Sequence, residues 1–248
     1  MDAVLMAVGL SLLAGLGTGF GGLIAVVRKP GQRVAGLLMG LAAGVMITLS
    51  FLELVDEAWQ ASGYLVTTLG FAGGALLMFL VDSLAPHIRF AEEERKASDA
   101  RLLKTGLLVA IGISIHNVPE GMAVGAGYMH LPEFGVFIAL AIALHNIPEG
   151  IATALPLYEG GVAKWKAFRI ALFSGLVEPI GALVAALLLV SFTGLIPPAL
   201  AFAAGVMVFI TLDELVPAAR EFGHQHFTAV GIILGAVLVF LLSGILGI

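Results

Sequence analysis

The chain consists of long apolar stretches separated by short segments that carry proline, glycine and charge. A helix that crosses the hydrocarbon core of a membrane needs about 20 apolar residues. The ten-residue alternation typical of a membrane barrel does not occur, and backbone in lipid must satisfy its hydrogen bonds within its own segment. The pattern therefore predicts an all-α integral membrane protein, a single domain over residues 1–248, with eight spans at about 3–27, 34–56, 64–85, 104–127, 133–155, 167–190, 198–219 and 227–247.

The twelve lysines and arginines fall in or beside alternate connections between these spans. They cluster between spans 1 and 2, 3 and 4, 5 and 6, and 7 and 8, and none lies on the other side. Because basic residues mark the cytoplasmic side of a membrane protein, we expect both termini outside the cell. The longest cytoplasmic loop is then 86–103.

Composition supports this class and excludes others. The 248 residues are 60% hydrophobic and only 12% charged, with a mean hydropathy of +1.07, whereas soluble domains carry about 25% charged residues. The 32 glycines lie inside apolar stretches, many of them four residues apart, a spacing that lets helices approach closely in lipid. Without cysteine there are neither disulfides nor thiolate ligands, and without a phosphate-binding loop ATP hydrolysis is not expected. A nucleic-acid partner is not expected either.

Two segments repeat one pattern inside the predicted spans 4 and 5: HNVPEG at 116–121 and HNIPEG at 145–150. Residues four apart share a helix face, so the histidine and the glutamate of each segment point the same way. The proline lacks an N–H and frees the carbonyl four residues earlier. The final glycine permits close approach of a neighbouring helix. Each segment is suited to an ion site at mid-membrane depth.

A third carboxylate, Glu178 in SGLVEPIG, lies in span 6. No lysine or arginine lies near the middle of any span, so three carboxylates packed together would repel one another without a bound cation or proton. Because ionisable residues inside a membrane are costly, they indicate function. The set predicts a divalent-metal site.

At these residues the sequence resembles the ZIP (Zrt/Irt-like) metal transporters, in particular their prokaryotic branch. The resemblance covers essentially the whole chain. Besides the HN-x-PEG pair and the E-P-x-G of span 6, it rests on GLAAGVM-x-x-x-S-x-x-E in span 2, D-x-x-x-P-H at the end of span 3 and DELVP in span 7.

The resemblance implies a binuclear metal centre midway across the membrane. One ion would be held by His116, Glu120, His145 and Glu149, with Met46 nearby. The second would be held by Asn117, Asn146 and Glu178, with the two motif glutamates bridging. The transport pathway would include five further residues: Glu53 at the entrance, and Asp82, His87, Asp213 and Glu214 toward the exit.

The resemblance also implies a two-bundle (3+2+3) architecture, in which spans 1, 4, 5 and 6 carry the metal and spans 2, 3, 7 and 8 form a scaffold. The expected activity is secondary transport by alternating access, importing divalent transition-metal ions across the cell membrane. Zn²⁺ is the first choice, and Fe²⁺, Mn²⁺, Co²⁺ and Cd²⁺ fit as well, as substrate rather than as cofactor.

Two other functions compete with transport of metal. A membrane-embedded binuclear metalloenzyme would need Glu-x-x-His pairs or several histidine clusters, whereas the predicted spans carry the order His-x-x-x-Glu and only two histidines. The HExxH motif of a membrane protease does not occur either. A proton-coupled transporter of another solute would leave the paired His-Asn pattern unexplained. The sequence leaves open which metal is physiological, whether one ion or two are bound, whether protons are co-transported, and whether the chain forms a homodimer.

Overall fold

The computed structural model describes residues 2–84, 99–222 and 225–247, apart from the side chains of 84, 99–113, 116, 221 and 222. Every secondary-structure element of the described residues is a helix, which confirms the predicted all-α class. The elements are α1 (Asp2–Arg28), α2 (Gln32–Thr48), the π-helix η1 (Leu49–Leu54), α3 (Val55–Leu84), α4 (Asp99–His130), α5 (Pro132–Glu159), α6 (Lys164–Gly175), α7 (Glu178–Ser191), the 3₁₀-helix η2 (Thr193–Leu195), α8 (Ile196–Ile210), the π-helix η3 (Thr211–Leu215), α9 (Val216–Phe222) and α10 (Gln225–Leu246).

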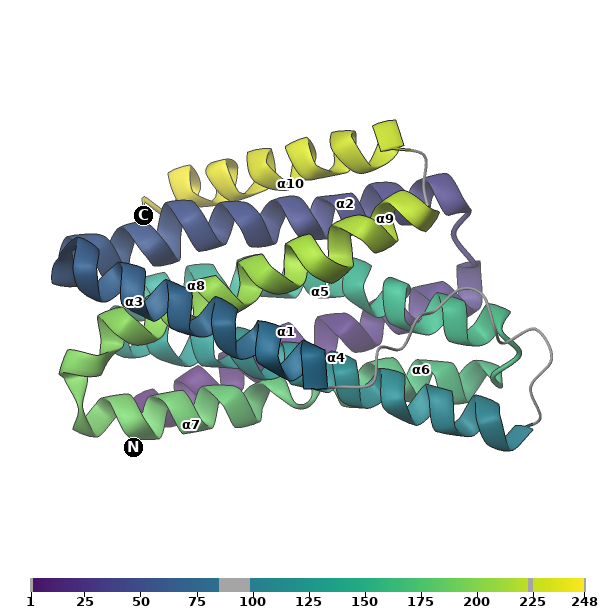
Figure 1. Cartoon of the computed structure of the whole chain (residues 1–248), viewed down its shortest axis with the longest axis horizontal. Helices are drawn as coiled ribbons and strands as arrows, with labels where there is room; N and C mark the ends of the chain where they lie inside the picture. The colour runs from purple at the N-terminus through teal and green to yellow at the C-terminus, as the bar shows by residue number, and fades with distance from the viewer. Residues whose placement is uncertain (1, 85–98, 223–224, 248) are drawn as a thin grey trace.

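Six helical segments of the described part are long and apolar enough to cross a membrane: 2–28, 32–83, 132–159, 164–191, 193–220 and 225–246. The segment 32–83 has 52 residues and covers two predicted spans. Gly63 interrupts it with φ 78°, a left-handed conformation that suits glycine. Figure 1 shows α2 running toward one end of the molecule and α3 running back from it. The predicted span 104–127 lies within α4, which begins at Asp99.

Five pairs of described helices approach so closely that only glycine fits at the contact. A Cβ added to Gly21 on α1 would lie 1.9 Å from the carbonyl oxygen of Ile147 on α5, and one added to Gly150 would lie 1.9 Å from that of Thr18. The same reciprocal contacts join α1 with α6, α4 with α7, α2 with α10 and α3 with α8. The expectation that glycines permit close helix approach is confirmed.

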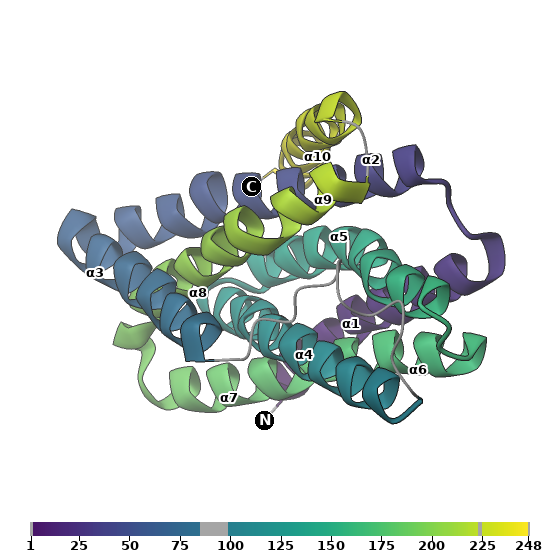
Figure 2. The ribbon, with the colours of Figure 1, turned by 45° about the vertical axis from the view of Figure 1, so that its right-hand side comes forward.

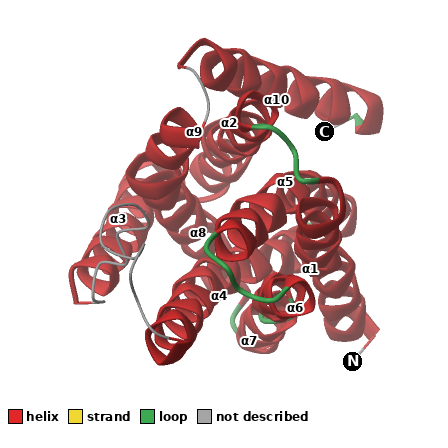
Figure 3. Ribbon diagram, turned by 90° about the vertical axis from the view of Figure 1, so that its right-hand side faces the viewer, coloured by secondary structure: helices red, strands yellow, loops and turns green. Residues whose placement is uncertain are grey.

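The five pairs lie in two groups. Figure 3, which looks nearly along the helices, shows α1, α4, α5, α6 and α7 on one side and α2, α3, α8, α9 and α10 on the other. Figure 2 shows the same grouping from another direction. The groups touch where α2 meets α5 and where α4 meets α8. The candidate site lies in the first group.

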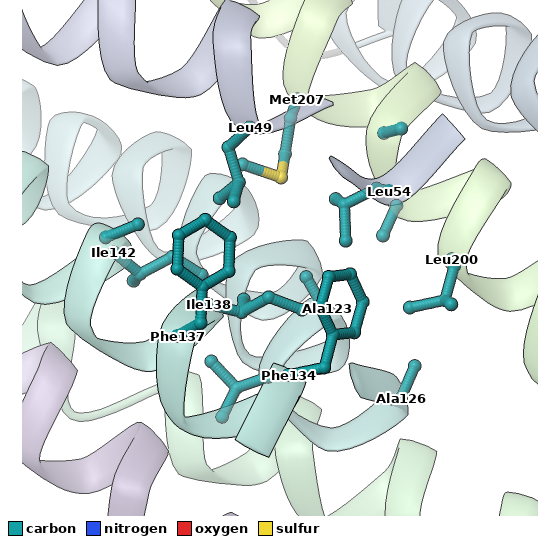
Figure 4. Close-up of a cluster of buried hydrophobic side chains, with 14 of the residues drawn as sticks. Leu49, Leu54, Ala123, Ala126, Phe134, Phe137, Ile138, Ile142, Leu200 and Met207 are labelled. Carbon is teal, nitrogen blue, oxygen red and sulfur yellow. The ribbon is translucent and has the colours of Figure 1, made fainter. Parts of the chain in front are cut away.

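Two apolar clusters fill the interior on either side of the middle of α5. The main apolar cluster, shown in Figure 4, is centred on the buried residues Leu49, Leu54, Ala123, Ala126, Phe134, Phe137, Ile138, Ile142, Leu200 and Met207. The second apolar cluster contains Ala25, Val26, Ala35, Ile151, Ala154, Leu155, Leu157, Ala167 and Ala171. On α5 the first cluster ends at Ile142 and the second begins at Ile151. The repeated motif at 145–150 lies between them.

Three of the predicted spans are not uniform α-helices. The span at 34–56 contains η1 with Glu53, and the span at 198–219 contains η3 with Asp213 and Glu214. The span at 167–190 is divided between α6 and α7, with two residues in a turn at 176–177. Departures from regular α-helix of this kind concentrate at functional sites. All three bring acidic residues to the interruption.

Candidate metal site

The structure brings together one histidine and two glutamates from the two HN-x-PEG segments. Glu120 comes from α4, and His145 and Glu149 come from successive turns of α5. One ligand atom from each lies within 4.8 Å of the other two. His145 Nε2 lies 3.2 Å from Glu120 Oε1. Imidazole and carboxylate groups at these separations fit a first-row divalent ion.

Both helices continue through their prolines, Pro119 and Pro148. The motif glycines lie at the closest contacts of the site. A Cβ on Gly121 would be 1.9 Å from the carbonyl oxygen of Glu178, and Gly150 faces Thr18 in the same way. The prediction that these two glycines admit neighbouring helices is therefore confirmed.

Asn146 connects the motif to two other helices. Its Nδ2 donates to the carbonyl oxygen of Ala14 on α1 at 2.9 Å and to Oε1 of Glu178 on α7 at 2.6 Å. Glu178 is fully buried and interacts electrostatically with both Glu120 and Glu149. The third carboxylate of the sequence prediction thus lies beside the first two.

Negative charge is concentrated here without a balancing side chain. Two carboxylates about 5 Å apart repel by about 3–4 kcal/mol at an effective dielectric constant of about 20. Among the described residues, no lysine or arginine pairs with a carboxylate of this site. A bound divalent cation or bound protons must supply the missing positive charge.

Many polar atoms of the site have no hydrogen-bond partner among the described residues, although native proteins leave few buried polar atoms unpaired. They belong to the motif residues, to Glu178 and to α1: Asn117 Oδ1 and Nδ2, Glu120 Oε2, His145 Nδ1, Asn146 Oδ1, Glu149 Oε2, Glu178 Oε2, Ser11 Oγ and Thr18 Oγ1. Oxygen atoms predominate in this set. The donors available match an ion that accepts oxygen and imidazole ligands.

Three predicted ligands remain: Asn117, His116 and Met46. Asn117 on α4 is fully buried, three residues before Glu120. The side chain of His116 lies outside the described residues. Met46 on α2 is buried in the main apolar cluster, where its sulfur accepts a hydrogen bond from Thr211 Oγ1 at 3.5 Å.

Glu53 on η1 lies toward the junction of α4 and α5. It is half-buried, forms a side-chain hydrogen bond with Ser243 on α10 and interacts electrostatically with Asp56 and Glu57. Glu57 in turn lies 2.6 Å from Nε2 of His130, the last residue of α4. This end of the molecule therefore carries clustered carboxylates.

The pathway residues expected on the exit side differ in their placement. Glu214 on η3 is half-buried and interacts electrostatically with Glu149, so it lies near the site. Asp213, its neighbour, is exposed, and Asp82 lies in the last turn of α3. His87 lies outside the described residues.

Two features of the site were not predicted from the sequence. The turn at 176–177 makes Glu178 the first residue of α7, and Pro179 follows it. Pro179 lacks an N–H, so the carbonyl of Gly175 loses its helical partner. The contact of Asn146 with Ala14 was also missed, because Ala14 contributes only its backbone. A proline directly after a buried glutamate is the signal that could have indicated the break.

The chain has clear relatives. The family described as "ZIP Zinc transporter" matches residues 85–243. A protein of Oceanobacillus iheyensis named "Zinc transporter ZupT" is 42% identical over 260 aligned positions, covering 96% of this chain and 97% of the relative. Proteins of the same name from Chlorobium luteolum and Streptococcus mutans are 41% and 40% identical and cover 94% and 93% of this chain and of their own lengths. The similarity extends over nearly the whole of each protein.

Proposed function

Because this chain belongs to the ZIP zinc transporter family, we propose that it carries divalent transition-metal ions, zinc first, across the membrane through the site around Glu120, His145 and Glu149. The observation that carries the proposal is this cluster of three ligand groups, held inside an apolar bundle without a basic partner. The relatives named as zinc transporters support the choice of ion. The chain is a multi-pass membrane protein, and we propose that it lies in the cell membrane.

The donor chemistry favours borderline ions. One imidazole with carboxylates suits Zn²⁺, Fe²⁺, Mn²⁺, Co²⁺ and Cd²⁺, whereas Mg²⁺ prefers oxygen ligands in octahedral geometry. A second ion would lie at Asn117, Asn146 and Glu178, where the amide and carboxylate oxygens without partners provide the ligands. His116 would complete the first site. The ions are substrate in this proposal, not a resident cofactor.

The site is shielded unequally at its two ends. On α5, only apolar residues lie between Phe134 and Ile142, and Phe134 precedes His145 by about 16 Å of helix. Glu120 and His145 are fully buried, whereas Glu149 is partly exposed and interacts electrostatically with Glu214. We propose that access runs from the Glu149 side, because the partly exposed ligand lies there, with the basic residues Lys164 and Lys166 following in the chain. We assign that side to the cytoplasm.

This arrangement supports import by alternating access. The eight predicted spans would place both termini outside. The two helix groups of the 3+2+3 architecture would move relative to each other. The group of α1 and α4–α7 holds the ion, and the group of α2, α3 and α8–α10 is the scaffold against which it moves. Closure at one end and access at the other correspond to one of the two states that such a cycle requires.

The test is uptake by purified protein in liposomes that contain a zinc-sensitive dye. Wild type should admit zinc down its gradient. The double variant Glu120→Ala/Glu149→Ala should lose at least about 90% of the rate, because it removes two charged ligands from a buried site.

The matched control is Glu133→Ala/Glu159→Ala. It also removes two glutamates, both exposed and at the two ends of α5. Its uptake should equal that of wild type. Equal uptake by both double variants would contradict the assignment of the site.

A further inference from the structure

Thr18 on α1 is one of three buried hydroxyl side chains, with Ser11 and Ser50, that lack a hydrogen-bond partner in the part of the chain that the structure describes. It is fully buried, and its Oγ1 has no hydrogen-bond partner among the described residues. An unpaired buried hydroxyl costs about 1–3 kcal/mol. Six hydroxyls elsewhere in the described helices instead donate to the carbonyl three or four residues earlier: Ser62, Thr67, Ser83, Thr153, Ser174 and Thr211.

The carbonyl that Thr18 would use in this way is already occupied. It belongs to Ala14, four residues earlier, and it accepts from Asn146 Nδ2 at 2.9 Å. The same amide group donates to Glu178 Oε1. Asn146 therefore takes the usual partner of the threonine hydroxyl, and the hydroxyl remains available for another one.

Thr18 also lies directly beside the Asn146–Glu178 pair. A helical side chain covers the turn that precedes its own Cα, so Thr18 covers the turn of Ala14 and Gly15. A Cβ on Gly15 would lie 3.3 Å from Glu178 Oε1. From the opposite side, a Cβ on Gly175 would lie 2.9 Å from the Cβ of Thr18. The hydroxyl is thus at the break between α6 and α7, next to the carboxylate that follows it.

We propose that Thr18 Oγ1 is an oxygen donor to the divalent cation that Asn146 and Glu178 hold, bound either to the ion or to one of its water ligands. The inference rests on the proposed function, since it requires a metal ion in this part of the site. Asn146 Oδ1 and Glu178 Oε2 are without partners at the same place. A neutral hydroxyl adds a ligand oxygen without adding negative charge to three crowded carboxylates. It therefore favours ions that accept oxygen ligands.

The experiment compares wild type with three variants of the purified protein. Thr18→Val removes the hydroxyl and keeps the shape, Thr18→Ser keeps the hydroxyl, and Thr67→Val removes an equally buried hydroxyl on α3 that bonds the carbonyl of Gly63. Zinc binding is measured by calorimetric titration, and Tm is measured with zinc and with chelator.

In Thr18→Val, the affinity of one zinc site should fall about 10- to 100-fold, the range found when a group supporting a metal is removed. Its Tm in chelator should be unchanged or higher, because an unpaired buried hydroxyl has gone, while the increase in Tm caused by zinc becomes smaller. Thr18→Ser should bind as wild type does. Thr67→Val should keep wild-type zinc affinity.

Unchanged zinc affinity in Thr18→Val, with a lower Tm in chelator, would overturn the inference and leave Thr18 a packing role. That result leaves the proposed function standing if wild type binds zinc. Failure of wild type itself to bind zinc would instead overturn the proposed function. The two failures are therefore distinguished by the wild-type titration alone.

Discussion

At the scale of single residues, the proposed site is built from carboxylates and an imidazole, groups that can bind either a metal ion or a proton. Glu120, His145 and Glu149 provide ligand atoms within 4.8 Å, and Glu178 adds a further buried carboxylate. A metal ion binds the deprotonated form of each group, so its binding releases any protons that they hold. Protons and metal ions thus compete for the same atoms.

This competition predicts that zinc affinity falls as the medium is acidified. Where a ligand group is protonated in the absence of metal, each proton that the ion displaces lowers the apparent zinc affinity by up to about tenfold per pH unit. Calorimetric titrations of the purified protein between pH 5 and 7.5 measure the effect. The Glu133→Ala/Glu159→Ala variant should follow the same curve. A flat affinity over this range would contradict a site built from these ligands.

Some of these residues could be predicted from local spacing and others could not. The four-residue spacing of His145 and Glu149 places them on one helix face, and the repetition of the motif predicted that Glu120 would join them. Asn146 has its partners 132 and 32 residues away, at Ala14 and Glu178. Such contacts depend on which helices pack together, and no local pattern encodes that.

At the scale of helices, packing relies on reciprocal contacts between glycine and backbone carbonyls. These contacts bring α1 against α5 at the motif itself, where Gly21 meets Ile147 and Gly150 meets Thr18. In lipid, where apolar side chains gain nothing by leaving water, such close packing is what holds helices together. Added volume at these positions should therefore separate helices that position the site.

Gly21→Ala should destabilise the protein by at least about 1–3 kcal/mol, because its Cβ would lie 1.9 Å from the carbonyl oxygen of Ile147. Gly9→Ala on the same helix is the control, since nothing lies within 4 Å of its Cβ. Thermal unfolding in detergent measures both. Equal Tm values for the two variants would show that α1 and α5 can separate without cost.

The interruptions of the helices were not predicted, for a physical reason. Hydropathy reports which residues prefer lipid, and it is the same for an α-helix, a π-helix and a broken helix. The π-helices η1 and η3 therefore fall inside predicted spans without a signal. Both π-helices overlap acidic segments of similar sequence, FLELVDE and TLDELVP.

At the scale of the whole molecule, the proposed topology places the two ends of α5 on opposite sides of the membrane. Exposed glutamates mark both ends, Glu133 in the first turn and Glu159 at the last residue. Because the chain has no cysteine, a single introduced cysteine is its only thiol. A pair of matched Glu→Cys substitutions therefore reports orientation directly.

In intact cells or spheroplasts, a membrane-impermeant thiol reagent should label Glu133→Cys, which lies at the end assigned to the outside. It should label Glu159→Cys only after the membrane is permeabilised. The basic residues near Glu159 give this expectation its physical reason, since they are retained on the cytoplasmic side. Labelling in the reverse order would overturn the proposed orientation.

The main apolar cluster has a consequence for the energy supply of the membrane. From Phe134 to Ile142, α5 presents only apolar residues above the site, and the largest of them are fully buried. A continuous thread of water would conduct protons and run down the gradient that powers a cell. Apolar packing of this depth would interrupt such a thread. On the proposed mechanism charge would then cross only with a conformational cycle, so a membrane could hold many copies and stay energised.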